Sequence, residues 1–165
     1  MNTTTITTMN TKKDNTLLKA FAALNVLPGG NVIFTKGVCL KAPYFSTINP
    51  KIAALRKNYC HVEMPMRRSV QNHIKTVHAI AMCNLAELTM GVVAEASIPK
   101  HLRWLPKSMD VQYLAKAESD LYATSELEAN CWESAPNVPL TVNIFDKNHR
   151  EVTRAIIQLW VTEKK

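Results

Sequence analysis

The sequence predicts an α+β fold in which a long antiparallel sheet wraps around one apolar helix. Two observations lead to this prediction. The segment from Ala79 to Ala96 is apolar on almost every side, and the residues after Pro99 change from a helical period to a period of two. A helix that is apolar nearly all round is buried nearly all round, and long twisted strands can bury it by curling around it. One extra helix is predicted before this arrangement.

The length and composition of the chain favour a single folded domain. The chain has 165 residues, of which 47% are hydrophobic, enough to form one sizeable core. The first residues, MNTTTITTMNTKKD, are polar and lack the apolar segment of a secretory signal. We therefore expect a flexible N-terminal tail over residues 1–14 and one domain over residues 15–165.

The same composition indicates a cytoplasmic protein without membrane insertion. The longest apolar run, residues 79–96, is interrupted by Asn84, Glu87 and Glu95, so it does not read as a membrane span. The four cysteines are far apart and form no C-x-x-C pair, which argues against a zinc site or a disulfide framework. We expect them to be free thiols.

The N-terminal half begins with a predicted helix that ends at a Pro-Gly-Gly turn. Two extended segments are predicted next, over Val32 to Ala42 and over Lys51 to Met66. The first helix is predicted because apolar residues recur every three or four positions. These residues are Leu17, Leu18, Phe21, Leu24 and Leu27.

The central helix carries a narrow polar stripe on its otherwise apolar surface. Thr76 is a candidate N-cap, and Pro99 biases Ile98 away from helical geometry, which sets the two ends of the helix. At 100° per residue, the stripe spans about 80°. Its members are Asn84, Glu87, Gly91 and Glu95.

Four strands are predicted after the central helix, and short links between them favour an antiparallel meander. Several run to ten residues or more, longer than usual, and such strands beside one apolar helix indicate the hotdog arrangement. The exposed sheet edge favours a dimer. The strands are expected over Ser108–Lys116, Asp120–Trp132, Val138–Asp146 and Glu151–Lys164.

Asn72, His78 and Glu87 form an N-x5-H-x8-E pattern that enters the central helix, with Thr76 and Val77 directly before the histidine. This pattern resembles hotdog-fold acyl-CoA thioesterases, most closely the branch that contains the phenylacetate-pathway and Them2-like enzymes. The resemblance covers the chain from about residue 32 to residue 165. It implies a homodimer or a dimer of dimers with sites at the subunit interface, and coenzyme A as part of the substrate rather than as a cofactor.

The predicted chemistry uses the start and the middle of the central helix. The amide N–H of Ala79 lies at the helix N-terminus, where it can stabilise the oxyanion of a thioester under attack. Glu87 is the candidate base or nucleophile, because a carboxylate on an apolar helix is costly unless it is paired or has a function. The resemblance implies that Asn72 orients the attacking water or holds the thioester oxygen.

Each of these residues also has a purely structural interpretation. Glu87 can instead pair with a basic residue of a partner subunit, and Asn72 can serve the turn before the helix. His78 is at least as compatible with a bond to the main chain as with catalysis. His73 and His78 are five residues apart and do not share a helix face, so we predict no metal site.

Two positions depart from the pattern of the resembled family. Lys75 stands where that family has glycine, and Ala79-Ile80 stands where it has two glycines, which allow the thioester to approach backbone amides. The leading hypothesis is an acyl-CoA thioesterase that acts on a fatty or aromatic acyl-CoA. The alternative, favoured by Ala79-Ile80, is a hotdog domain that binds acyl-CoA or lipid without catalysis.

Basic residues flank the central helix on both sides, within a chain of net charge +7. They are candidates for holding the phosphates of coenzyme A, although such charges are also common on solvated surfaces, and the sequence does not single out individual ligands. Nucleic acid is not expected, because no helix has a continuous basic face and no aromatic-basic motif occurs. The flanking residues are Arg67, Arg68, Lys75, Lys100, His101, Arg103 and Lys107.

Overall fold

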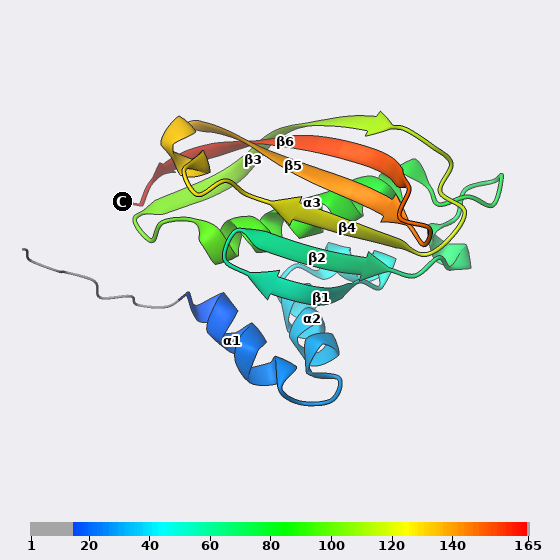
Figure 1. Cartoon of the computed structure of the whole chain (residues 1–165), viewed down its shortest axis with the longest axis horizontal. Helices are drawn as coiled ribbons and strands as arrows, with labels where there is room; N and C mark the ends of the chain where they lie inside the picture. Colours follow the sequence, from blue (N-terminus) through cyan, green and yellow to red (C-terminus); the bar gives the residue numbers. More distant parts are fainter. Residues whose placement is uncertain (1–14, 165) are drawn as a thin grey trace, which may run out of the picture.

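The computed structural model describes residues 15–164, in which a six-stranded sheet curves over one long helix (Figure 1). The helices are α1 (Thr16–Asn25), α2 (Gly30–Lys41) and α3 (Ala79–Ser97), with short 3-10 helices η1 (Pro43–Ile48), η2 (Arg68–Val70) and η3 (Cys131–Ser134). The strands are β1 (Lys51–Arg56), β2 (Tyr59–Met64), β3 (Leu102–Tyr113), β4 (Leu121–Glu126), β5 (Asn137–Asp146) and β6 (Glu151–Glu163). The predicted tail, residues 1–14, lies outside the described residues.

The sheet has the strand order β1-β2-β4-β5-β6-β3, and every neighbouring pair is antiparallel. The predicted fold class, an antiparallel sheet around a central helix, is therefore confirmed. The simple meander is wrong for β3, because β3 pairs with β6, with Leu102 opposite Glu163 and Tyr113 opposite Thr153. Because β3 pairs only with β6, it lies at one edge of the sheet. Strand β4 lies between β2 and β5.

Helix α3 forms the centre of the core and packs against β1, β2, β4, β5 and β6. Leu85, Leu88 and Met90 are almost completely inaccessible to solvent. Full burial of one such side chain contributes about 1.5–3 kcal/mol. Among the described residues, α3 is the one helix long and apolar enough to span a membrane, but here its apolar surface is covered by the sheet.

The extended segment expected over Val32 to Ala42 is wrong, because residues 30–41 form helix α2. This helix packs against α1 and β1, with the ring of Phe34 edge-on to Phe21 at 5.1 Å. A Cβ atom at Gly30 would lie 1.7 Å from the carbonyl oxygen of Leu24, so only glycine allows this close approach. The β-branched residues suggested a strand, and tertiary packing overrides that local preference.

Several other boundaries differ from the sequence prediction. Strand β4 ends at Glu126 instead of continuing to Trp132, because the chain turns into η3 before β5. The N-cap of α3 is His78 rather than Thr76. Strand β3 runs from Leu102 to Tyr113, so it begins before the predicted start at Ser108, and the segment predicted over Lys51 to Met66 forms the paired strands β1 and β2. Strands β5 and β6 agree well, and Val138 and Leu140 on β5 point into the core as their alternation predicts.

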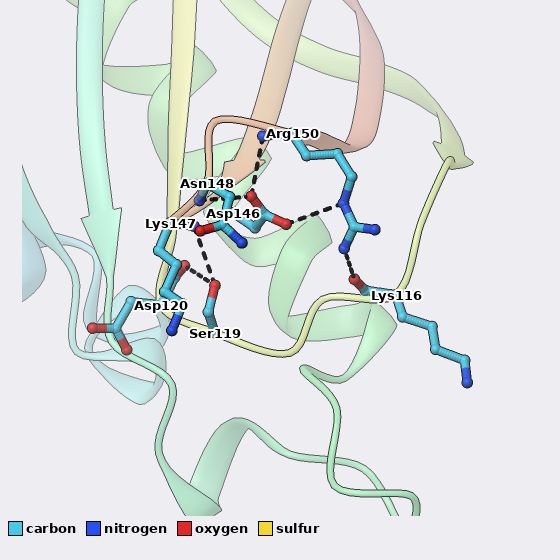
Figure 2. A network of polar contacts seen from close by, with 7 residues as sticks. All are labelled: Lys116, Ser119, Asp120, Asp146, Lys147, Asn148 and Arg150. Atoms are coloured by element: carbon cyan, nitrogen blue, oxygen red, sulfur yellow. Dashed lines mark hydrogen bonds and ion pairs between the residues drawn. The ribbon is translucent and has the colours of Figure 1, made fainter.

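A polar network ties the β5–β6 turn to the link between β3 and β4 (Figure 2). Asp146, which is 4% exposed, accepts hydrogen bonds from the amides of Asn148 and Arg150 and from the Arg150 guanidinium, and Arg150 also donates to the carbonyl oxygen of Lys116. The next residue, Ala117, accepts a hydrogen bond from the amide of Val77, two residues before α3 begins. The network therefore helps to fix the start of α3.

Candidate functional site

The loop before α3 is held together by Asn72. Its Oδ1 atom accepts hydrogen bonds from the amides of Ile74 and Thr76, each at 3.1 Å, and its Nδ2 atom donates to Thr76 Oγ1 at 2.8 Å. The main chain of Asn72 also bonds to Thr76 and Lys75. In this chain the side chain of Asn72 serves the turn, because both its amide oxygen and its amide nitrogen are bonded within the loop.

His78 and Ala79 form the N-terminus of α3. His78 caps the helix, with its Nδ1 atom accepting from the amide of Ile80 at 3.1 Å, while its carbonyl oxygen accepts from Ala81 and Met82. The amide of Ala79 has no acceptor among the described residues. Because the helix dipole makes this end positive, the free N–H of Ala79 can donate to a bound carbonyl oxygen or anion.

The two departures from the family's glycines have different structural consequences. Lys75 has a φ of 64°, in the left-handed region that glycine adopts without strain, so the fold accepts lysine there at a cost of about 1–2 kcal/mol. Ile80 is 56% exposed and points away from the core. It therefore narrows the surface next to the Ala79 amide without clashing with the rest of this chain.

A small cavity of about 190 Å³ opens beside the first turn of α3, between this turn, η1 and the C-terminal end of η2. Asn84, which is 5% exposed, borders it, with Nδ2 donating to Thr47 Oγ1 at 3.1 Å and Oδ1 buried without a partner among the described residues. A buried unpaired amide oxygen is costly, so it marks a place where a ligand donor would be favourable. The cavity is lined by Tyr44, Thr47, Ile48, Ser69, Val70, Gln71, His78, Ile80, Ala81 and Asn84.

Glu87 is half-buried on the outward face of α3, and its carboxylate has no hydrogen-bond or ion-pair partner within residues 15–164. It lies eight residues after Ala79, which is about 12 Å along the helix axis. A glutamate side chain cannot span that length, so one chain does not bring the carboxylate of Glu87 to the free amide of Ala79.

The C-terminal part of the polar stripe is closed by Trp104 of β3. The indole Nε1 donates to the Glu95 carboxylate at 3.3 Å, and the ring edge would lie 3.5 Å from a Cβ atom at Gly91. The space beside Gly91 is therefore filled by Trp104 in this chain. Glu95 and Gly91 serve packing, whereas Glu87 stands apart from that packing.

A thiol and a phenol lie on the same side of α3 as Glu87. Cys83, one turn before Glu87, has its sulfur 3.3 Å from the hydroxyl of Tyr113 at the end of β3. The hydrogen bond to Cys83, together with partial burial, raises the pKa of Tyr113 to about 12. The phenol is therefore protonated at neutral pH and can act as a hydrogen-bond donor.

The basic residues that flank α3 do not form one cluster. Arg67 and Lys75 lie before the helix and Lys100 and Arg103 after it, so about 28 Å of helix separates the two groups. Arg67 donates to the carbonyl oxygen of Thr47, and Arg103 donates to Thr162. One chain therefore offers two separate positive regions.

A larger cavity, about 880 Å³, is an open groove on the face of the sheet opposite α3. Tyr122 stacks on Phe145 there and its hydroxyl lies 2.8 Å from His149 Nδ1, with His61 on its other side. Burial lowers the pKa of His61. This row of rings stabilises three neighbouring strands and lies away from the start of α3. Among residues 15–164, no group of three or more His, Cys, Asp or Glu side chains could hold a metal ion.

Two residues of the site region were missed by the sequence analysis. Thr47, the partner of Asn84, comes from a 3-10 helix within a segment that carried no periodic signal. Trp104 lies in the part of β3 that precedes the predicted strand. Each contact joins two different elements, so the periodicity of a single element could not have revealed it.

Comparison with known proteins shows which family this chain belongs to. Residues 30–161 match the model of a domain of unknown function, DUF4442. The chain belongs to the DUF4442 family. A structural-genomics crystal structure is 38% identical to this DUF4442 chain, with a TM-score of 0.79, over 90% of this chain and 98% of the other. A search of curated proteins found no match.

More distant solved structures share the hotdog fold. A thioesterase from Haemophilus influenzae is 13% identical to the DUF4442 chain, with a TM-score of 0.63, over 73% of this chain and 82% of its own length. A variant of a thioesterase from Staphylococcus aureus is 15% identical, with a TM-score of 0.64, over 73% and 98%. At these identities the likeness shows the hotdog fold, and the branch within thioesterases suggested by the sequence motif stays a prediction.

Proposed function

We propose that this DUF4442 protein is an acyl-CoA thioesterase that hydrolyses a fatty or aromatic acyl-CoA to the free acid and coenzyme A in the cytoplasm. The observation that carries the proposal is the combination of a free amide at Ala79 and an unpaired carboxylate at Glu87 on the same helix. Thioester hydrolysis needs one group that stabilises an oxyanion and one that activates water or attacks directly. The thioesterase-like fold supports the same reaction class.

In this proposal the two groups come from different subunits of a homodimer. Ala79 and Glu87 are about 12 Å apart along the helix axis of one chain, and an antiparallel pairing of two α3 helices would bring Glu87 of each subunit toward the Ala79 amide of the other. The unpaired edge of β3 is a suitable surface for such pairing. A dimer of two such dimers is compatible with the same arrangement.

Asn72 and His78 have supporting roles in the proposal. Asn72 shapes the loop that presents the Ala79 amide, and His78 holds the first turn of the helix. Structures of the Staphylococcus aureus protein carry alanine in place of a glutamine or a glutamate. Along the sequence of that protein, the glutamine and the glutamate are separated by the same number of residues as Asn72 and Glu87 in this chain.

The decisive experiment measures thiol release from a panel of acyl-CoAs of different chain lengths, including aromatic ones. Glu87→Gln should reduce kcat at least about 100-fold, because a general base contributes that much or more. Glu95→Gln is the matched control on the same helix and should leave kcat near that of the wild type. If none of the acyl-CoAs is hydrolysed, the proposed thioesterase activity is refuted.

The alternative function is an acyl-CoA-binding or lipid-binding domain without catalysis. The observation that favours it is Ile80, which crowds the surface next to the amide where two glycines would leave it open. Calorimetric binding of an intact acyl-CoA with no thiol release would decide for this alternative.

The shared site has a test of its own. Ala79→Pro removes the amide N–H, and Glu87→Gln removes the carboxylate. Mixed dimers of the two variants, made by unfolding and refolding together, contain one intact site if the groups come from different subunits. Half of randomly formed dimers are mixed, so about a quarter of wild-type activity should return. If both groups act within one chain, no activity returns.

A further inference from the structure

The helical hairpin formed by α1 and α2 projects beyond the β1 edge of the sheet (Figure 1). Its turn and outer surface are rich in exposed apolar side chains. Val26 is 80% exposed and Leu40 is 84% exposed, values that are unusual for large apolar residues in a folded domain. We call Val26, Leu27, Ile33, Lys36 and Leu40 the hairpin face.

Helix α2 is apolar on two opposite sides. Phe34 and Val38 point inward and pack on the rest of the domain. Ile33 and Leu40 point outward, close to each other by helical angle, and Lys36 lies beside them. A helix that is apolar on both sides normally has a second surface to cover it, and no described part of this chain covers the outer side.

The charged residues of the hairpin itself, and of the segment up to β2, are all cationic. From residue 15 to residue 62 the chain contains no Asp or Glu, while six Lys and Arg residues occur in the same segment. Two of these cations are neutralised in part, because Lys51 pairs with Glu63 and Arg56 pairs with Glu126. Lys36 and Lys41 of α2 have no ion-pair partner within residues 15–164.

We propose that the hairpin face docks on the surface of an anionic lipid bilayer. Exposed apolar side chains interspersed with lysines, without acidic residues, fit a surface that offers acyl chains below and negative headgroups above. A second copy of this chain is a poorer occupant, because a two-fold pairing of the hairpin face would bring lysines from both copies, and no acidic residue of the hairpin, into one interface. In this proposal the docking is interfacial: the hairpin lies on the bilayer surface and does not cross it.

Vesicle co-sedimentation tests the proposal with the full-length protein. The protein should sediment with vesicles of phosphatidylcholine and phosphatidylglycerol and remain in solution with vesicles of phosphatidylcholine alone. Binding should weaken as salt rises, because the lysine contribution is screened. Each lysine near an anionic surface contributes about fivefold to binding, so Lys36→Glu should weaken it more than tenfold.

Variants identify the surface that binds. The double variant Ile33→Glu with Leu40→Glu should abolish sedimentation, whereas Ile74→Glu is the matched control, because Ile74 is a similarly exposed apolar residue outside the hairpin. Circular dichroism confirms that each variant is folded.

Two outcomes would overturn the proposal. The first is equal binding of the wild type and the double variant to anionic vesicles. The second is an absence of wild-type binding to anionic vesicles. If light scattering then shows a change in oligomeric mass in the double variant, the face is assigned to a second copy of the chain. Neither outcome depends on thioesterase activity.

Discussion

The two ends of the outward face of α3 differ in how their polar groups are used. At the C-terminal end, Trp104 covers Gly91 and donates to Glu95, so the glycine and the carboxylate both belong to the packing. Nearer the N-terminus, the amide of Ala79 and the carboxylate of Glu87 have no partner within residues 15–164.

This difference separates structural from functional reasons for polarity on one helix. A carboxylate that the fold uses can be explained by the contact it makes, as at Glu95. A carboxylate that the fold does not use needs another explanation, and Glu87 is the candidate. The four residues of the stripe share one sequence pattern, so only their contacts distinguish them.

The largest effect is expected when the free amide N–H of Ala79 is removed and helix α3 is kept intact. Ala79→Pro deletes the amide N–H at the first helical position, which accepts proline well, and His78 already has the extended ψ of 138° that precedes proline. If the proposed chemistry is right, kcat for thioester hydrolysis should fall about 10²–10³-fold.

Ala79→Gly is the control for this prediction, because it keeps the N–H and should retain most of the activity. Thermal unfolding of Ala79→Pro should match that of the wild type. Full activity in the proline variant would show that the amide of Ala79 is not the oxyanion donor.

The next largest effect is expected at the C-terminal end of the outward face of α3, which Trp104 covers. Trp104→Ala should lower the free energy of unfolding by about 2 kcal/mol, below the usual cost of a fully buried tryptophan because this side chain is partly exposed. Urea denaturation measures the change. Trp104→Phe keeps most of the packing and isolates the hydrogen bond to Glu95.

Activity per folded molecule should remain unchanged in both tryptophan variants. A loss of kcat in Trp104→Phe would mean that the two ends of the helix face are coupled, contrary to the distinction drawn above.

A smaller effect of opposite sign is expected at Gly91. A Cβ atom there would meet the indole edge of Trp104 at 3.5 Å, an ordinary van der Waals contact. Gly91→Ala should therefore raise the free energy of unfolding by about 0.5–1 kcal/mol, because alanine is the better helix former. A decrease in denaturation experiments would show that the indole cannot accommodate the methyl group.

The last effect appears only in acid and concerns the turn that supports the start of α3. Burial of Asp146 opposes ionisation, but hydrogen bonds from the amides of Arg150 and Asn148 and the Arg150 guanidinium outweigh it and lower its pKa from 3.8. The folded state therefore binds fewer protons than the unfolded state below that value. The contribution of ionised Asp146 to the free energy of unfolding is therefore present above about pH 4. It is lost as the pH falls through the pKa of Asp146 in the folded state.

Asp146→Asn should flatten the loss of stability below pH 4, as followed by urea midpoints across pH. Asp110→Asn, at an exposed position on β3, is the control and should keep the wild-type profile. Identical profiles for Asp146→Asn and the wild type would contradict the lowered pKa.

The sequence predicted the central helix to within one residue at its end, and it predicted strands β5 and β6 close to their observed bounds. Apolar residues around the whole circumference of α3 and strict alternation in β5 are local signals that burial alone explains. Helix α2 was predicted wrongly, because its β-branched residues have strand preference and its helical state depends on packing against α1 and β1. The pairing of β3 with β6 joins distant segments and has no local signal.

By itself, the sequence determined the fold class and the buried helix, with Asn72, His78 and Ala79 at its start and Glu87 in its middle. Only the tertiary structure decided which polar residues on that helix are already in use. Trp104 on β3 reaches Glu95 and Thr47 on η1 reaches Asn84, each from a separate element, whereas nothing in residues 15–164 reaches Glu87. The physical reason is that periodicity reports which side of an element is buried, while a hydrogen-bond partner depends on how distant elements pack.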